Sequence, residues 1–390
     1  MKRIALFLLM IPALTHGQVS EKTTVSVITC GPSQEELYTA FGHSAFRVHD
    51  PESGYDAIYN YGVFNFRQKH FYLNFARGYL YYQLGVHDYR DFEYHYISDN
   101  RFIHEQVLNL NQSQKQKLIE FLEWNALPEN QHYRYDYFYD NCATKIRDVI
   151  KNVFGDSVEF SDSHINTNYT IRELTDLYLV YQPWGDLGID ICLGLPMDKK
   201  AAPIEYMFLP DFVEAGFDNA VVLKENGNEP LVLKKVSTFE AKPQEHSTGV
   251  FTPLNVFSLL FIIAMIISYR DWSRKRLTHV FDVILFSVLG SVGLLLLLLW
   301  VATDHRAAAK NFNLLWAIPT HLIASVAFIR QPQWLKHYFL ATFIIAVLTL
   351  LCWLILPQQL HYALVPIVLT IALRSFVQYR MRVHPNIPGS

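Results

Sequence analysis

The stretch FYDNCATKIRDVI, residues 138–150, places a cysteine at the point where an aromatic-rich segment gives way to an amphipathic helix. Asn141 is the expected N-cap of that helix. Its expected buried stripe consists of Ile146, Val149, Ile150 and Val153. A helix N-terminus offers unpaired N–H groups and positive potential, which stabilise a thiolate. Cys142 is therefore a candidate nucleophile, and a packing role remains open for it when this stretch is taken alone.

The residues around this helix predict a domain of mixed α and β structure. TTVSVITC (23–30) alternates like a strand, and residues 43–64 predict a hairpin with a turn near its middle. FYLNFARG (71–78) and YLYYQLGV (79–86) look like further strands, and residues 113–127 predict an amphipathic helix. We therefore expect an α+β fold for this part of the chain.

Polar and apolar residues are segregated along the 390-residue chain. Residues 1–17 predict a secretory signal, in which Lys2 and Arg3 precede an apolar run too short to span a bilayer. An uncleaved anchor is the alternative, and both interpretations place the following residues outside the cytoplasm. Residues 18–227 are then an exported domain, and residues 228–250 a linker. The net charge of -3 gives no sign of nucleic-acid binding.

Five apolar segments follow, each near the length needed to cross hydrocarbon. They are roughly 251–269, 279–301, 313–329, 338–356 and 361–379. Basic residues are densest in the first loop between them and in the tail, and moderate in the third loop, which places these three in the cytoplasm. We therefore expect residues 251–390 to form an all-α domain of five spans with a cytoplasmic tail. The protein would be a multi-pass protein of the cytoplasmic (inner) membrane, with its exported domain on the periplasmic side.

A histidine in the motif FGHSAFRV (41–48) is the candidate partner of the thiol. His43 lies at the start of a strand, and Gly42 permits a close approach. A thiol attack on an acyl carbon needs a thiolate, which a neighbouring imidazole can generate. A strand histidine that precedes a helix cysteine has the spatial logic of papain-like thiol enzymes in permuted order. Taken alone the pair is a weak signal, because the domain contains many histidines. This chemistry requires no metal and no diffusible cofactor.

Four cysteines limit the disulfides that can form. Three of them, Cys30, Cys142 and Cys192, lie in the expected exported part, so at most one disulfide can form among these three. A bond between Cys30 and Cys192 would leave Cys142 free, but the sequence does not decide whether it exists.

The two motifs FGHSAFRV and YDNCATKIRD (139–148) resemble the paired motifs of the Lnb-type lipoprotein N-acyltransferases. Further matching segments are CGPSQEELYTAFGHSA (30–45), YNYGVFNF (59–66), LGLPMDKKA (193–201) and TDHRAAAKNFNLLWAIP (303–319). More distantly, the order of histidine and cysteine is similar to lecithin:retinol acyltransferase and permuted NlpC-type folds. The resemblance implies an exported, permuted papain-like domain. It also implies transfer of an acyl chain from a phospholipid donor to the α-amino group of the diacylglyceryl-cysteine of a lipoprotein acceptor at the bilayer.

By position, the resemblance implies Cys142 as nucleophile and His43 as general base. The strand after the histidine supplies a third, orienting group, for which Asn60 is the first candidate and Tyr59 and Tyr61 are rivals. The backbone N–H of Cys142 is an expected oxyanion donor. Substrate or lipid contact is considered for eight residues, each with packing, capping or a plain loop as the alternative. They are Tyr59, Tyr61, Tyr139, Asn141, Asp304, His305, Asn311 and Asn313.

Three other classes of function remain open at this stage. A cysteine peptidase or amidase would use the same pair, but it would need a polar groove and no membrane spans. A phospholipid hydrolase would share the first half-reaction, so only a test with an acceptor distinguishes it. A non-enzymatic membrane assembly factor would tolerate replacement of both Cys142 and His43.

Overall fold

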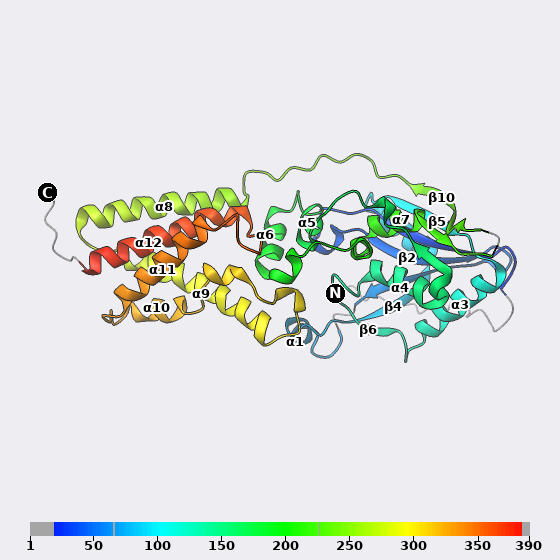
Figure 1. Cartoon of the computed structure of the whole chain (residues 1–390), viewed down its shortest axis with the longest axis horizontal. Helices are drawn as coiled ribbons and strands as arrows, with labels where there is room; N and C mark the ends of the chain where they lie inside the picture. The colour runs from blue at the N-terminus through cyan, green and yellow to red at the C-terminus, as the bar shows by residue number, and fades with distance from the viewer. Residues whose placement is uncertain (1–18, 65–66, 226, 384–390) are drawn as a thin grey trace, which may run out of the picture. The chain divides into compact units, whose positions relative to one another are not determined.

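The computed structural model describes residues 19–64, 67–225 and 227–383, and the expected signal in residues 1–17 lies outside them. The chain divides into two compact units (Figure 1). Unit 1 contains the described residues up to Phe75 together with Tyr79–Asn168 and Ala201–Glu245. Unit 2 contains Ala76–Gly78, Tyr169–Lys200 and the described residues from His246 onward.

Unit 1 is built on a seven-stranded antiparallel sheet in the order β10-β5-β1-β2-β3-β4-β6. Its strands are β1 (Thr24–Cys30), β2 (His43–Asp50), β3 (Tyr55–Val63), β4 (Tyr81–Asp88), β5 (Ile103–Leu108), β6 (His132–Arg134) and β10 (Val232–Phe239). β2 and β3 form the predicted hairpin. A second sheet contains β7 (Val158–Phe160), β8 (Ala220–Val222) and β9 (Glu229–Pro230). β10, from the expected linker, thus adds an edge strand to the main sheet.

Helices pack on both faces of this sheet, because alternate strand residues point to opposite sides. The helices on one face are α3 (Gln112–Ala126), α4 (Cys142–Phe154) and α7 (Pro210–Asp218), and the other face carries α2 (Tyr89–Ser98). Phe46 belongs to the core under α3, α4 and α7, and its neighbour Ala45 belongs to the core under α2. The predicted stripe of α4 is buried in the core on its own face of the sheet, which confirms both the helix and the α+β class.

The strand predicted over residues 71–78 is wrong. The segment contains α1 (Phe71–Ala76), and the N–H of Asn74 donates to the carbonyl of His70 at 2.8 Å, as in a helical turn. A short run of aromatic and apolar residues has no period that separates helix from strand, so pattern alone could not decide it. The remaining short helices of unit 1 are η1 (Leu37–Thr39), η2 (Gly155–Ser157), η3 (Asp162–His164) and η5 (Pro203–Phe208).

Unit 2 contains the apolar helices. They are α8 (Pro253–Arg274), α9 (His279–Val301), α10 (His321–Ala327), α11 (Leu335–Leu351) and α12 (Val365–Val383). Among the described residues, three helices are long and apolar enough to cross a membrane: Pro253–Arg274, His279–Val301 and Tyr362–Val383. α11 is apolar but has only 17 residues.

The expectation of five full-length spans is therefore not confirmed. Residues 313–329 do not form one helix but η7 (Phe312–Leu315), a turn and the short α10. Pro319 lies inside this range and lacks the N–H that a continuous helix needs. Outside residues 169–200, the other short helices of this unit are η6 (Arg306–Ala308) and η8 (Tyr362–Leu364).

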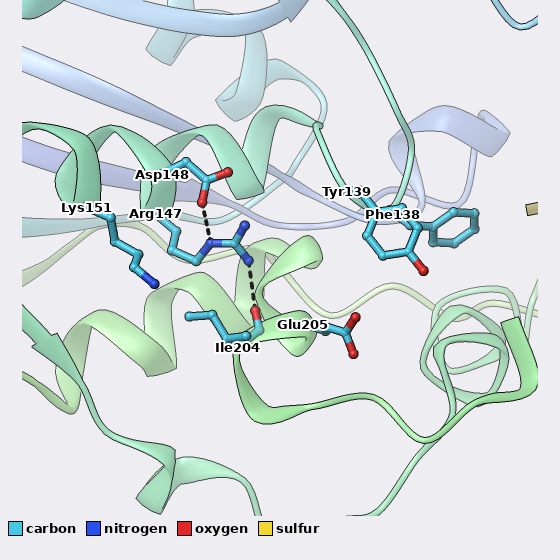
Figure 2. A pocket seen from close by; sticks show the side chains of 7 residues that line it. All are labelled: Phe138, Tyr139, Arg147, Asp148, Lys151, Ile204 and Glu205. Carbon is cyan, nitrogen blue, oxygen red and sulfur yellow. Dashed lines mark hydrogen bonds and ion pairs between the residues drawn. The ribbon is translucent and has the colours of Figure 1, made fainter. Parts of the chain in front are cut away.

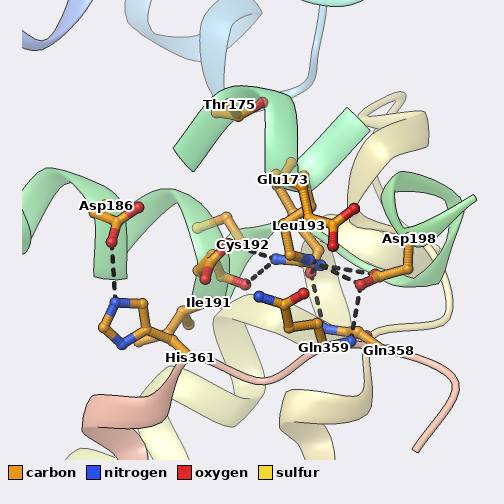
Figure 3. Close-up of polar contacts among 12 residues, drawn as sticks. Glu173, Thr175, Asp186, Ile191, Cys192, Leu193, Asp198, Gln358, Gln359 and His361 are labelled. Carbon is orange, nitrogen blue, oxygen red and sulfur yellow. Dashed lines mark hydrogen bonds and ion pairs between the residues drawn. The ribbon is translucent and has the colours of Figure 1, made fainter. Parts of the chain in front are cut away.

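Residues 169–200 of unit 2, which we call the cap, contain α5 (Ile171–Asp176), α6 (Pro183–Cys192) and η4 (Leu195–Asp198). Arg172 is fully buried there and donates to the carboxylates of Asp190 at 2.7 Å and Asp198 at 3.0 Å. The loop before α12 binds the cap as well (Figure 3): His361 Nε2 lies 3.1 Å from Asp186 Oδ2, and Gln358 Nε2 donates to the carbonyl of Leu193. The cap is thus joined by polar bonds to the membrane part of the chain.

Candidate active site

Cys142 is the first residue of α4, and Asn141 caps this helix as predicted. Asn141 Oδ1 accepts a hydrogen bond from the N–H of Thr144, and Thr144 Oγ1 accepts one from the N–H of Asn141, both at 2.8 Å. Asn141 Nδ2 donates to the carbonyls of Tyr137 and Phe208, each at 2.8 Å. Both the oxygen and the nitrogen of the buried Asn141 amide therefore form hydrogen bonds, and they fix the start of the helix against two other segments.

His43 and Asn60 come together on neighbouring strands. His43 begins β2, and its Nε2 lies 2.6 Å from Asn60 Oδ1 on β3. The imidazole also forms a hydrogen bond with the Cys142 thiol, for which Nδ1 remains once Nε2 faces Asn60. The structure thus brings Cys142, His43 and Asn60 into one connected row.

The rival residues Tyr59 and Tyr61 point to the other face of β3, because side chains alternate along a strand. Both belong to the core under α3 and α4. Tyr59 Oη lies 3.0 Å from the hydroxyl of Tyr55, and Tyr61 Oη donates to Asn125 Oδ1 at 2.6 Å. Both hydroxyls thus have partners away from His43, and the structure supports a packing role for these two residues.

Two glycines with left-handed backbone allow the close approach. Gly42 has φ +79°, and a Cβ on it would lie 2.7 Å from the carbonyl oxygen of Cys30. Gly62 has φ +91° and follows Asn60 at a register shift between β3 and β4. A Cβ on Gly62 would lie 3.5 Å from Cys142 Cβ. A bulge beside a reactive group is a common way to re-aim a strand, and here only glycine adopts it without strain.

The surroundings of Cys142 favour its thiolate. Burial opposes ionisation, but the charge of His43, the hydrogen bond from its ring and the backbone N–H groups of Ser44 and Ala143 outweigh it and lower the pKa of Cys142. For His43, burial opposes protonation, while the charge and hydrogen bond of Cys142 and the hydrogen bond to Asn60 together raise its pKa. The two shifts are reciprocal, and each favours the charged form of its group.

The second thiol of unit 1 has the opposite character. Cys30 pairs with His43 across the β1–β2 ladder, yet burial raises the pKa of the Cys30 thiol far above its ordinary value. Cys30, Cys142, Cys192 and Cys352 are all free. The two thiols differ because the charge and hydrogen bond of His43 lower the pKa of Cys142, with the backbone N–H groups of Ser44 and Ala143 adding to them, whereas burial dominates at Cys30. In the described part of the chain, no group of three or more His, Cys, Asp or Glu is placed to hold a metal ion.

Tyr133 is a residue of this site to which the sequence pattern assigned no chemistry. Its hydroxyl oxygen is buried and makes no hydrogen bond of good geometry with any described residue. The N–H of Gly62 approaches the oxygen, which leaves the hydroxyl hydrogen without an acceptor. Burial raises the pKa of Tyr133, and the charge of Cys142 raises it further, so the phenol stays protonated. The site thus contains an unused donor close to the thiol.

Tyr96 and Arg101 lie behind the imidazole, and no motif marks them in the sequence. The Tyr96 ring lies nearly parallel to His43 with centroids 6.4 Å apart, and the guanidinium carbon of Arg101 lies 4.5 Å from the Tyr96 centroid. Arg101 is buried and donates to the carbonyl of Gly31 at 2.7 Å. Its charge opposes protonation of His43, which limits the rise in the pKa of His43.

Tyr139 is exposed and borders a cavity of about 240 Å³ beside α4 (Figure 2). The other lining residues are Phe138, Arg147, Asp148, Lys151, Ile204 and Glu205. Arg147 donates from Nε to Asp148 at 2.7 Å and from a terminal nitrogen to the carbonyl of Ile204 at 2.8 Å. The cavity therefore has charges of both signs along its wall.

The four polar candidates of the loop after α9 belong to unit 2. The N–H of Asp304 donates to the carbonyl of Arg77, and the N–H of His305 approaches Thr303 Oγ1 at 3.4 Å. Asn311 and Asn313 are buried. Their amides donate to main-chain carbonyls at the end of α6, the shortest contact being 2.8 Å from Asn311 to Ile191. This placement favours a structural role for the two asparagines.

Two family models match the chain. The model described as the Lnb N-terminal periplasmic domain matches residues 14–176, and the model described as the Lnb transmembrane domain matches residues 244–385. Together they account for most of the chain, and residues 177–243 lie between them. No curated protein and no solved structure gives a significant match.

Proposed function

Because the chain belongs to the Lnb family, and is thus a membrane protein of lipoprotein processing with an extracytoplasmic domain, we propose that it is a lipoprotein N-acyltransferase of the cytoplasmic membrane. It would transfer an acyl chain from a phospholipid to the α-amino group of a diacylglyceryl-cysteine. The observation that carries this proposal is the position of Cys142 at the start of α4 against His43, whose Nε2 lies 2.6 Å from Asn60 Oδ1. A thiol helix packed on a sheet that bears the histidine also supports the permuted papain-like fold for unit 1.

In the first half-reaction, the proton of Cys142 passes to His43, and the thiolate attacks an ester carbonyl of the phospholipid. The carbon–sulfur bond forms, the ester carbon–oxygen bond breaks, and His43 returns the proton to the departing alkoxide. The products are an acyl-thioester on Cys142 and a lysophospholipid. Asn60 accepts a hydrogen bond from Nε2, which holds the ring with Nδ1 toward sulfur.

The tetrahedral intermediate of this step carries a negative oxygen that needs donors. The backbone N–H of Cys142, the first residue of α4, is one. The Tyr133 hydroxyl is a second, since it is protonated, buried and without an acceptor among the described residues. Donors that are fixed before the reaction stabilise the charge without reorganising.

In the second half-reaction, the α-amino group of the lipoprotein attacks the thioester. Its nitrogen–carbon bond forms, the carbon–sulfur bond breaks, and His43 takes the proton lost by the amine. Donor and acceptor are both confined to the bilayer, so an enzyme with its own spans replaces a three-dimensional encounter with a positioned one. The spanning helices thus support a transferase over a cell-wall peptidase or amidase.

Intact mass of the full-length protein in phospholipid nanodiscs tests the proposal. The wild type should gain the mass of one acyl chain, and hydroxylamine should remove it, because thioesters are labile to this nucleophile. Cys142→Ser and His43→Ala should not form this adduct. Cys192→Ser is the matched control and should keep it, because burial raises the pKa of the Cys192 thiol and its helix position is C-terminal.

A synthetic diacylated lipopeptide, added next, separates the transferase from its rivals. Transfer of the acyl mass to the peptide amine supports the N-acyltransferase. Discharge to water with the peptide unchanged identifies a phospholipid hydrolase. Absence of the adduct in wild type, with lipoprotein N-acylation in cells insensitive to Cys142→Ser and His43→Ala, would show a non-enzymatic protein.

A further inference from the structure

The turn between α5 and α6 exposes apolar side chains within the otherwise well-bonded cap. Val180 is 61% exposed and Trp184 38%, and Leu177 and Tyr181 are exposed as well. These four residues, which we call the apolar rim, lie within one stretch of eight residues. Clustered exposed apolar side chains mark an interaction surface. The rim lies outside both matched family ranges, so the family matches assign it no role.

Polar and apolar residues of the cap are distributed opposite to those of a water-soluble element. Arg172 and Asp190 are buried in the cap interior, and Asp186 is bonded to His361. Outward positions of the neighbouring turn and of the first turn of α6 are taken by Val180 and Trp184. A segment in water is stabilised when apolar side chains are buried and charged ones face outward. A segment at a lipid surface is stabilised when apolar side chains face outward, as they do here.

The rim is continuous with a membrane-spanning helix. Trp184 Nε1 donates to the carbonyl of Phe251 at 2.8 Å, and its ring lies 5.4 Å from the ring of Phe251 and 5.9 Å from that of Phe257. α8 begins at Pro253, so Phe257 lies about 6 Å along the helix axis. Trp184 therefore lies at the level where a spanning helix begins.

We propose that the apolar rim is immersed in the headgroup layer of the extracytoplasmic leaflet and anchors the cap to the bilayer. Tyrosine and tryptophan are enriched at this level, where an apolar ring and a polar group are both accommodated. The exposed residues of α8, among them Leu259, Ile262 and Ile266, continue the same surface into the hydrocarbon. This continuity identifies the occupant as lipid.

The cap holds the rim at a fixed depth. The contact between Asp186 and His361 joins α6 to the loop before α12, and the Trp184–Phe251 hydrogen bond joins it to the residues before α8. Two spanning helices thus position the rim, which cannot leave the lipid without breaking these polar contacts. The result is an interfacial anchor between two spanning helices, formed by a segment that does not itself cross the membrane.

Fluorescence at a labelled rim position tests this directly. The full-length protein, with Cys142→Ser, Cys192→Ser and Cys352→Ser and the buried Cys30 retained, carries Val180→Cys with an environment-sensitive dye. Leu233→Cys in the same background is the matched control, because Leu233 is an equally apolar residue, 68% exposed, on β10 of unit 1. Both proteins are placed in nanodiscs containing phosphatidylcholine with a nitroxide either near the headgroup or near the methyl end.

We expect the dye at position 180 to lose most of its fluorescence to the shallow nitroxide, less to the deep one, and little to aqueous iodide. The dye at position 233 should respond to iodide alone. Strong iodide quenching at position 180 would place the rim in water. Protection from iodide and from the nitroxides at both depths would place the rim under protein, either unit 1 or a second copy. Either of these two results overturns the proposal, and matched thermal unfolding of the two labelled proteins shows that both are folded.

Discussion

The candidate active site and the cap each bury charged side chains, but they differ in how completely their hydrogen bonds are satisfied. In the cap, all three guanidinium nitrogens of Arg172 donate, to two carboxylates and to main-chain carbonyls. In the candidate site, the thiol and imidazole have one hydrogen bond to each other, and the hydroxyl hydrogen of Tyr133 has no acceptor in the described part of the chain. A fully bonded cluster has nothing left to offer a substrate, whereas an incompletely bonded one does. The same chain therefore contains one buried cluster whose hydrogen bonds are complete and another, at the candidate site, whose hydrogen bonds are not.

Replacing the proposed nucleophile should separate the candidate site from the cap most clearly. Cys142→Ala should lower acyl transfer by about 10³-fold or more, because the covalent route is lost. It should change the free energy of unfolding by only about 1 kcal/mol, as for a small side chain of modest burial. Mass-detected acylation and thermal unfolding of the same sample measure both. A large loss of stability with partial activity would contradict the contrast between site and cap.

Arg172→Met should give the opposite pattern. Asp190 and Asp198 would remain buried without their cation, which costs about 3–5 kcal/mol when one partner of a buried pair is removed. Thermal unfolding in detergent should show the loss, while the pH dependence of Cys142 alkylation should stay as in wild type. Adding Asp190→Asn and Asp198→Asn should restore part of the stability, since the unpaired charges are then gone.

Tyr133→Phe probes the unused hydroxyl. Loss of one oxyanion donor should lower the rate of acyl-enzyme formation by about 10²-fold with little change in KM. If the hydroxyl had only a structural role, its removal would leave the rate unchanged and would be neutral or slightly stabilising, since a buried group without an acceptor is itself unfavourable. Single-turnover kinetics beside thermal unfolding distinguishes the two. Tyr135→Phe, on the same aromatic wall, is the matched control.

The pH dependence of Cys142 alkylation tests the ion pair. The pKa of Cys142 is lowered, so the thiolate should react with iodoacetamide at a pH below that of an ordinary thiol. His43→Ala removes the attraction to the imidazolium but leaves the burial, so the midpoint should move to higher pH. Asn60→Ala should move it in the same direction by less, since Asn60 acts through His43. An unchanged midpoint in His43→Ala would show that the helix start alone activates the thiol.

Local patterns were sufficient for the elements nearest the thiol. The period of Ile146, Val149 and Ile150 predicted α4, and the alternation around a turn predicted the β2–β3 hairpin. The same alternation explains why Asn60, and neither tyrosine beside it, reaches His43. Aromatic residues without a clear period misled the prediction at residues 71–78, where α1 forms.

Features that depend on distant segments could not be read from the sequence. The cap has the composition of the exported domain, and its place in unit 2 follows from bonds to Asn311, Gln358 and His361, more than 110 residues later. Residues 313–329 have the hydropathy of a span, but Pro319 and the buried Asn313 interrupt the helix. Tyr133 has an unused hydroxyl only because of what the folded chain leaves around it.

The amide of Asn141 also sets an order of events during export. It completes the start of α4 by bonding the carbonyl of Phe208, which follows it by 67 residues. A chain that emerges N-terminus first therefore exposes Cys142 well before Phe208, whose carbonyl accepts a hydrogen bond from the Asn141 amide. Until Phe208 arrives, the start of α4 lacks one of the contacts that fix it. The helix start that carries the candidate nucleophile is thus completed late in the folding of this unit.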